Sequence, residues 1–143
     1  MEYPKFKVGD RVVVLETAKE ATVAAFRPKS SGVGYKYDFR LDDGSERTRP
    51  EWVLASPDEC VFCVVGHEAL DGDGSMLWTD GAYRKRDDAV KRLGEIADNW
   101  IENIGKCIDR YQTERSDDSF EAWEDGYYDN NHFSVVVNAC RLA

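Results

Sequence analysis

The stretch DDAVKRLGEIADNWIENIGKCIDRY, residues 87–111, decides the fold of the C-terminal part of this chain. Its apolar residues recur at steps of three and four, which predicts one helix of about six turns with a single apolar face. These residues are Val90, Leu93, Ala97, Trp100, Ile101, Ile104, Ile108 and Tyr111. Asp87 and Asp88 suit the helix start, because negative charge is favourable at the positive end of the helix dipole. Gly105 predicts a bend near the other end.

Apolar runs on both sides of this helix predict strands. Residues 60–65 form a continuous apolar run, typical of a strand covered on both faces, and residues 75–79 predict a second strand. Residues 133–142 predict a last strand that pairs with the first, because valine favours strands. Residues 117–125, which end before Gly126, predict a short second helix. We therefore expect an α+β unit with one long helix packed on an antiparallel sheet.

The N-terminal part shows the shorter period of strands. Alternating β-branched and aromatic residues predict strands at 11–16, 21–26, 35–41 and 45–48, with residues 50–54 closing the unit. The dipeptide Asp43-Gly44 predicts a tight hairpin turn. Strands this short favour a small, highly curved antiparallel β-barrel, because a flat sheet of this size would leave one apolar face uncovered.

Three segments of the N-terminal part resemble known families. FKVGDRV at residues 6–12, YDFRLDDG at residues 37–44, and Trp52-Val53 resemble the Tudor and KOW-type small barrels. This resemblance implies binding of methylated side chains, peptides or nucleic acid through aromatic residues at the open end of the barrel. The aromatic set for such a ligand site is Phe26, Tyr35, Tyr37 and Trp52, acting by cation–π attraction. The alternative is that these aromatic residues fill the barrel interior.

The C-terminal part resembles a different group. GAYRKRDDA at residues 81–89, with the acidic loop before it and the long helix after it, resembles small α+β domains of uncharacterised phage and bacterial proteins. That resemblance implies no known catalytic activity. Phage-encoded inhibitors of bacterial defence, anti-CRISPR proteins among them, are similar in size and acidity.

Charge is distributed unevenly along the chain. Residues 1–56 carry ten basic and nine acidic residues, and residues 57–143 carry nine and nineteen, which gives net charges of +1 and −10. The change falls at Ser56-Pro57, so we expect a barrel domain at 1–56 and an acidic α+β domain at 57–143. A net charge of −9 opposes direct nucleic-acid binding and favours a basic protein surface as partner, such as that of a nucleic-acid-binding complex.

Residues 114–129 concentrate this charge, with seven acids against the single base Arg115 and with aromatic residues between the acids. Clustered carboxylates raise the negative potential and aromatic side chains supply contact area, so the segment suits docking on a basic groove. The predicted partner-binding residues are Asp117, Asp118, Phe120, Glu121, Trp123, Glu124, Asp125, Tyr127 and Tyr128. The alternative is a solvated acidic helix whose aromatic side chains pack inward on the long helix.

The motifs that could indicate a catalytic or metal-binding site lack the spacing or the companion residues that such a site requires. Cys60 and Cys63 have CxxC spacing, but residues three apart in a strand face opposite sides, which opposes a zinc knuckle. The loop at 71–75 lacks the later Gly and Glu of a calcium loop. His67 and His132 are the only histidines, and no nucleophile or oxyanion element accompanies them. We therefore expect no catalytic residue, no metal and no cofactor, and we expect all four cysteines to be reduced and buried.

These expectations together favour a non-enzymatic protein-binding module. Its most specific form is an anti-CRISPR-like phage inhibitor that blocks a bacterial nucleic-acid-handling defence complex through an acidic surface. The alternative is a protein that binds nucleic acid or a modified peptide through the N-terminal barrel. The long helix carries more apolar positions than one small sheet covers, which favours a homodimer. No apolar run has the length of a membrane span, so we expect the cytoplasm, of the host cell if phage-encoded.

Overall fold

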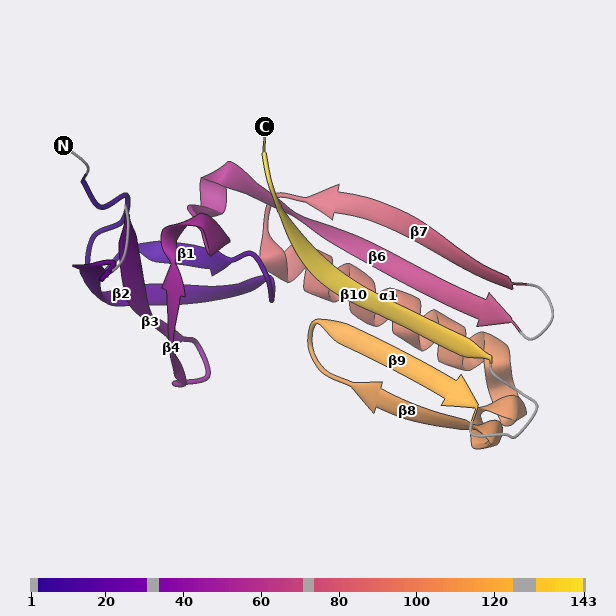
Figure 1. The fold of residues 1–143 in the computed structure, drawn as a ribbon. Coiled ribbons are helices and arrows are strands. Elements are labelled where there is room, and N and C mark those ends of the chain that lie inside the picture. The colour runs from indigo at the N-terminus through magenta and orange to yellow at the C-terminus, as the bar shows by residue number, and fades with distance from the viewer. Residues whose placement is uncertain (1–2, 31–33, 71–73, 125–130, 143) are drawn as a thin grey trace. The chain divides into compact units, whose positions relative to one another are not determined.

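The computed structural model describes residues 3–30, 34–70, 74–124 and 131–142. The chain divides into two compact units, one of Met1–Val61 with Ala139–Ala143 and one of Phe62–Asn138. Each unit is built on a five-stranded antiparallel sheet, and the second unit also holds the long helix (Figure 1). The fold is therefore α+β and rich in strands. No helix in the described ranges is long and apolar enough to cross a membrane.

The sheet of the first unit curls into half of a barrel. Its strands are β1 (Arg11–Val14), β2 (Lys19–Pro28), β3 (Tyr35–Leu41), β4 (Glu46–Pro50) and β5 (Leu54–Ala55), in the spatial order β4-β3-β2-β1-β5. The register of β2 against β3 shifts between Val23 and Ala25, and such a bulge bends the strand that carries it. The strand expected at 35–41 is confirmed at both ends, whereas the closing segment begins with a 3₁₀ turn, Glu51–Val53, rather than with a strand.

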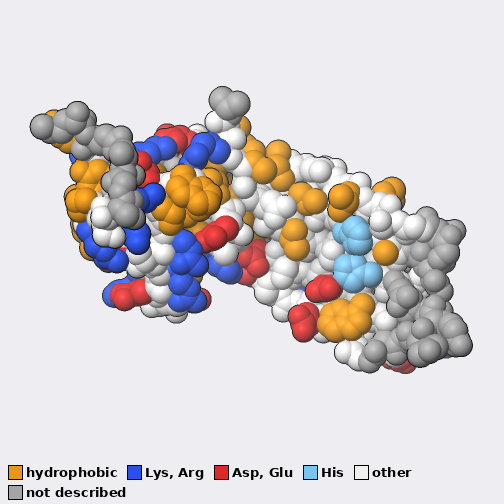
Figure 2. Space-filling model, viewed as in Figure 1, with side chains coloured by type: hydrophobic (Ala, Val, Ile, Leu, Met, Phe, Trp, Pro, Cys, Tyr) orange, Lys and Arg blue, Asp and Glu red, His pale blue; other side chains and the backbone are white. Residues whose placement is uncertain are grey.

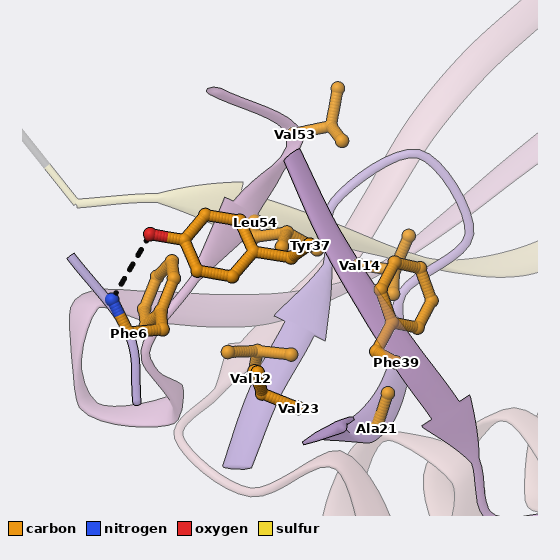
Figure 3. Close-up of a cluster of buried hydrophobic side chains, with 9 residues drawn as sticks. All are labelled: Phe6, Val12, Val14, Ala21, Val23, Tyr37, Phe39, Val53 and Leu54. Atoms are coloured by element: carbon orange, nitrogen blue, oxygen red, sulfur yellow. Dashed lines mark hydrogen bonds between the residues drawn. The ribbon is translucent and has the colours of Figure 1, made fainter. Parts of the chain in front are cut away.

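A buried apolar cluster fills the concave side of this half-barrel (Figure 3). It consists of Phe6, Val12, Val14, Ala21, Val23, Tyr37, Phe39, Val53 and Leu54. Tyr37 is fully buried, and its ring meets Phe6 edge-on at 5.4 Å. Its hydroxyl accepts a hydrogen bond from the Phe6 backbone N–H at 3.2 Å and donates one to Glu51 at 2.7 Å. Both polar capacities of the buried phenol are therefore used, which removes most of the cost of its burial.

In the second unit one helix covers one face of the sheet (Figure 1). The strands are β6 (Cys60–Leu70), β7 (Gly74–Tyr83), β8 (Tyr111–Arg115), β9 (Ser119–Glu124) and β10 (His132–Arg141), and the helix is α1 (Arg86–Ile104). Their spatial order is β7-β6-β10-β9-β8, so the first and last strands are neighbours, as expected from the sequence. Ala89, Leu93 and Ala97 are the buried side chains of α1; they recur every four residues, and Leu93 and Ala97 belong to its expected apolar face.

Aromatic side chains join α1 to the sheet. Trp100 of α1 stacks on Phe133 of β10 at 5.0 Å with a 13° angle between the rings, and it also contacts Phe120 and Tyr111. Trp78 of β7 lies on the same side of the sheet, 6.3 Å from Phe133. The contacts of Trp100 identify residues of β8, β9 and β10 that point toward the helix.

The helix is shorter than its apolar pattern predicts. It ends at Ile104, where Gly105 takes a φ of 57°, and a 3₁₀ segment, Gly105–Arg110, leads into β8. The expected six-turn helix through Tyr111 is therefore wrong, and the bend expected near Gly105 is the helix end. Tyr111 still packs on Trp100, which explains why its position fits the apolar stripe.

The short helix expected at 117–125 is also wrong. Ser119–Glu124 is strand β9, in which Phe120 and Ala122 are buried while Glu121 is exposed. This alternation has the two-residue period of a strand, whereas the acidic residues before it had suggested a helix cap. The acidic turn at Asp117 and Asp118 instead connects β8 to β9.

The first strand of the second sheet is covered on one face only. Cys60, Phe62 and Val64 are buried while Val61, Cys63 and Val65 are half-buried, so the expectation of two covered faces is wrong. The expectation arose because the residues on both faces of this strand are apolar between positions 60 and 65. The expectation of four buried thiols is also wrong, because Cys107 and Cys140 are exposed.

Candidate docking face

Side chains of the second sheet that point away from α1 form a broad face that α1 does not cover. Since Trp100 of α1 contacts Tyr111, Phe120 and Phe133, the alternate residues of these strands lie on the opposite side. The contact of His132 with His67 extends the set to β6, and the register pairs of β6 with β7 extend it to β7. We call this set the open face; it contains Cys63, Val65, His67, Leu77, Thr79, Gln112, Glu114, Glu121, Trp123, His132, Ser134 and Val136.

Two histidines and a glutamate occupy the middle of the open face. The Nδ1 atoms of His67 and His132 lie 3.3 Å apart, and Nε2 of His132 lies 2.9 Å from Oε1 of Glu121. The imidazole rings are tilted by 54° with their centroids 5.4 Å apart. Figure 2 shows both histidines side by side at the surface, with acidic and apolar side chains near them. The three side chains come from β6, β10 and β9, three adjacent strands.

Two like charges face each other at one side of this group. Glu114 of β8 and Glu121 of β9 are direct cross-strand partners, and both are exposed. Like charges directly opposite each other destabilise a sheet, unless a positive group lies close by. Glu121 is bonded to His132, which is charged only when protonated. The arrangement therefore favours an added cation at this place.

The open face also has an apolar part. Leu77 is 75% exposed on β7, and the open face also contains three half-buried side chains, Val65 on β6, Val136 on β10 and Trp123 on β9. Leu77 pairs in register with His67, so the apolar and polar parts are continuous. A surface with an aromatic and aliphatic centre and charged neighbours has the composition of a protein–protein interface.

The structure separates the residues predicted to bind a partner. Asp117 and Asp118 both pair with Arg86, at 3.5 and 2.7 Å, and the side chains of Arg86 and Asp118 are only 14% and 12% exposed. Phe120 is buried under α1, and Glu124 accepts a hydrogen bond from Asn131. Glu121 and Trp123 lie on the open face. Asp125, Tyr127 and Tyr128 lie outside the described residues.

The predicted aromatic ligand site of the barrel is only partly assembled. Phe26 contacts Tyr35 at 5.9 Å and Tyr37 at 6.2 Å, but Tyr37 is fully buried and belongs to the core. Trp52 is 69% exposed and makes no ring contact with the other three in the described part of the chain. Phe26 is 39% exposed, so Phe26 and Trp52 are the members with substantial free surface.

The first unit offers an open hollow on its curved sheet. Its volume is about 670 Å³, and three arginines line it together with acidic and apolar residues. The arginines are Arg27, Arg47 and Arg49. Arg27 pairs with Asp38 at 2.7 Å and Arg49 pairs with Glu16 at 2.6 Å, so much of this positive charge is already matched.

The two cysteines of the CxxC motif are not brought together in the structure. Cys60 and Cys63 lie on opposite faces of β6, and burial raises the pKa of the Cys60 thiol. The loop at 71–73 lies outside the described residues. Among the described residues, no group of three or more His, Cys, Asp or Glu side chains is placed to hold a metal ion.

Comparison with known proteins adds no assignment to this geometry. No protein-family model matches the chain, nor does any curated protein or any solved structure.

Sequence reasoning missed the histidine pair and the open face itself. His67 and His132 are 65 positions apart, and only the pairing of the first and last strands brings them together. One local signal was present: in SFEAWE, residues 119–124, apolar and polar residues alternate up to Ala122, which is typical of a strand with one exposed face.

Proposed function

We propose that this chain is a non-enzymatic binding protein that docks the open face on a basic, partly apolar surface of a partner protein. The observation that carries the proposal is the exposed cross-strand pair of Glu114 and Glu121 on a face that also carries Trp123, two residues from Glu121 on β9, and Leu77 on the opposite edge strand β7. A Lys or Arg of the partner between the two carboxylates relieves their repulsion, and apolar contact with Leu77 and Trp123 adds area removed from water.

The charge of the second unit supports a basic partner. Phe62–Asn138 holds 17 acidic and 8 basic residues, for a net charge of −9, whereas the first unit holds 11 of each. An excess of one sign accelerates encounter with the opposite sign and raises the salt dependence of binding. Only the second unit has this property.

In its most specific form, the proposal is a phage-type, anti-CRISPR-like inhibitor of a bacterial defence complex that handles nucleic acid. Surfaces that bind phosphate backbones are rich in Lys and Arg, so an acidic face competes for them. The acidity of the second unit and the resemblance in size and charge to such inhibitors support this form. The expected activity is loss of nucleic-acid binding by the complex, reversed at high salt.

The test compares two double variants with equal changes in charge and size. Leu77→Ala with Glu114→Lys alters the open face, and Met76→Ala with Glu102→Lys alters exposed residues that lie off it. Each variant is used to capture partners from bacterial lysate, and the affinity for the captured protein is then measured. We expect the open-face variant to bind about tenfold more weakly, which corresponds to about 1.4 kcal/mol, and the control to bind like wild type.

Equal loss in both variants would show that only net charge matters, and no loss in either would reject the open face. Light scattering of the unmodified chain measures its mass in solution. It thereby detects a third outcome, in which the open face joins two copies of the chain. Reversal of Asp118 is unsuitable as a test, because it would break the nearly buried pair with Arg86 and destabilise the fold.

The hollow of the first unit favours a second function, binding of nucleic acid or a modified peptide by the half-barrel. Arg47 and Arg49 line it, and Trp52 and Phe26 are exposed aromatic residues of the same unit. Titration of the whole chain with short single-stranded oligonucleotides or a methyl-lysine peptide tests this function. Saturable binding that Arg47→Ala or Trp52→Ala abolishes would support it, and absence of saturation would reject it.

A further inference from the structure

The spacing of His67 and His132 has the dimensions of a chelate. Their Nδ1 atoms are 3.3 Å apart. Two imidazole nitrogens that each lie about 2.0–2.1 Å from one tetrahedral metal ion are separated by about 3.3–3.4 Å. The strands that carry them are adjacent in the sheet, so the backbone holds this separation.

Glu121 sets the tautomer that such a site requires. A carboxylate only accepts hydrogen bonds, so Nε2 of His132, at 2.9 Å from Glu121 Oε1, carries a proton. In the neutral ring this leaves the lone pair of His132 on Nδ1, which points to His67. A carboxylate that accepts from the far nitrogen of a ligand histidine is the usual outer partner in metal sites, where it orients the ring and raises its basicity.

We infer that His67 and His132 form a two-nitrogen binding site for a divalent transition-metal ion of the zinc, nickel and copper group, with Glu121 as the carboxylate behind His132. Imidazole nitrogen suits these ions, whereas Mg²⁺ and Ca²⁺ prefer oxygen. The His132 side chain is 27% exposed, which leaves the remaining coordination positions open to water.

Binding of the metal needs only a change of tautomer. Without metal, Nδ1–H of His67 donates to the lone pair of His132 Nδ1. When the metal binds both Nδ1 atoms, that proton leaves Nδ1 of His67 and His67 takes a proton on Nε2 from water. The number of protons on the two neutral rings is unchanged, and no oxidant or reductant takes part.

The experiment uses the untagged full chain with Cys107→Ser and Cys140→Ser, because exposed thiols also bind zinc. Zn²⁺ is titrated by calorimetry and by nitrogen NMR of the imidazoles. The chain has only two histidines, so every imidazole signal belongs to the site. We expect saturable shifts of both Nδ1 signals with Zn²⁺ and none with Mg²⁺.

Variants separate this site from adventitious binding. His67→Ala and His132→Ala should each weaken Zn²⁺ binding at least about tenfold, and Glu121→Gln should weaken it by about tenfold or more while circular dichroism stays unchanged. The Leu77→Ala, Glu114→Lys variant should keep its zinc affinity. Loss of partner binding in this variant therefore tests the docking function without testing the zinc site. Unshifted imidazole signals, or an affinity in His67→Ala within about twofold of the unmodified value, would overturn the inference.

Discussion

Tyr37 is a residue of the buried core of the first unit. The resemblance to small barrels placed this residue in an aromatic ligand site, yet its ring is fully buried and its hydroxyl is bonded to Phe6 and Glu51. Burial, followed by the hydrogen bond to the Glu51 carboxylate, raises the pKa of Tyr37 from 10.0 to about 12. The residue is therefore structural, and ligand binding by this unit rests on Phe26, Trp52 and the arginines.

Alkaline titration tests this placement. The folded protein favours the neutral phenol of Tyr37. The contribution of this phenol to the free energy of unfolding is therefore complete below about pH 10 and is lost as the pH rises through about 12. Burial also raises the pKa of Tyr83 and Tyr111, but tyrosine absorbance should show one phenol that ionises near pH 12, and Tyr37→Phe should remove it. The same variant leaves the Phe6 N–H without its acceptor, so we expect the free energy of unfolding to fall by about 1–3 kcal/mol. If a phenol that ionises near pH 12 persists in Tyr37→Phe, the placement is wrong.

Gly66 allows Trp78 to lie on the sheet. A Cβ at this position would come within 2.0 Å of the Trp78 ring, so Gly66→Ala should displace the ring from its place beside Phe133. We expect a loss of about 1–3 kcal/mol in denaturant unfolding.

Gly94→Ala is the matched control for this change. It lies inside α1, where a Cβ meets only Arg115 at 3.7 Å, and it should stabilise the protein by about 0.5–1 kcal/mol. Equal effects of the two substitutions would contradict the packing of Trp78 on Gly66.

At the scale of elements, the end of α1 depends on Gly105. Its φ of 57° lies in the left-handed region, and nothing lies within 4 Å of the place a Cβ would take. Gly105→Ala should therefore cost about 1 kcal/mol through backbone strain alone, measured by denaturant unfolding. A stabilised variant would show that the helix continues past Ile104, as its apolar stripe suggested.

Local signals predicted some elements well and others poorly. Strand β3 and the Asp43-Gly44 turn follow from side-chain alternation and turn chemistry, which act between neighbours in the sequence. Strand β9 was mistaken for a helix, because Asp117 and Asp118 are typical of helix starts while here they pair with Arg86, more than 30 positions away. Contacts at that separation have no local sequence signal.

At the scale of the whole molecule, the sequence shows the charge asymmetry but does not show which surface of the folded chain carries the acidic residues. The sequence indicated residues 114–129, whereas the structure places Phe120 in the core and Asp118 in a nearly buried ion pair. The open face combines Glu121 and Trp123 of that segment with residues of four other strands, such as Leu77, His67 and His132. Strand order decides this combination, and strand order is a property of the folded chain.

Hydroxyl-radical footprinting of the chain in complex with its captured basic partner tests the open face most directly. Trp123 and Leu77 report on the open face, and Trp52, which is 69% exposed, reports on the half-barrel of the first unit. We predict that oxidation of Trp123 and Leu77 falls several-fold in the complex while that of Trp52 is unchanged. Protection of Trp52 with unchanged oxidation of Trp123 and Leu77 would contradict docking through the open face and would assign binding to the half-barrel.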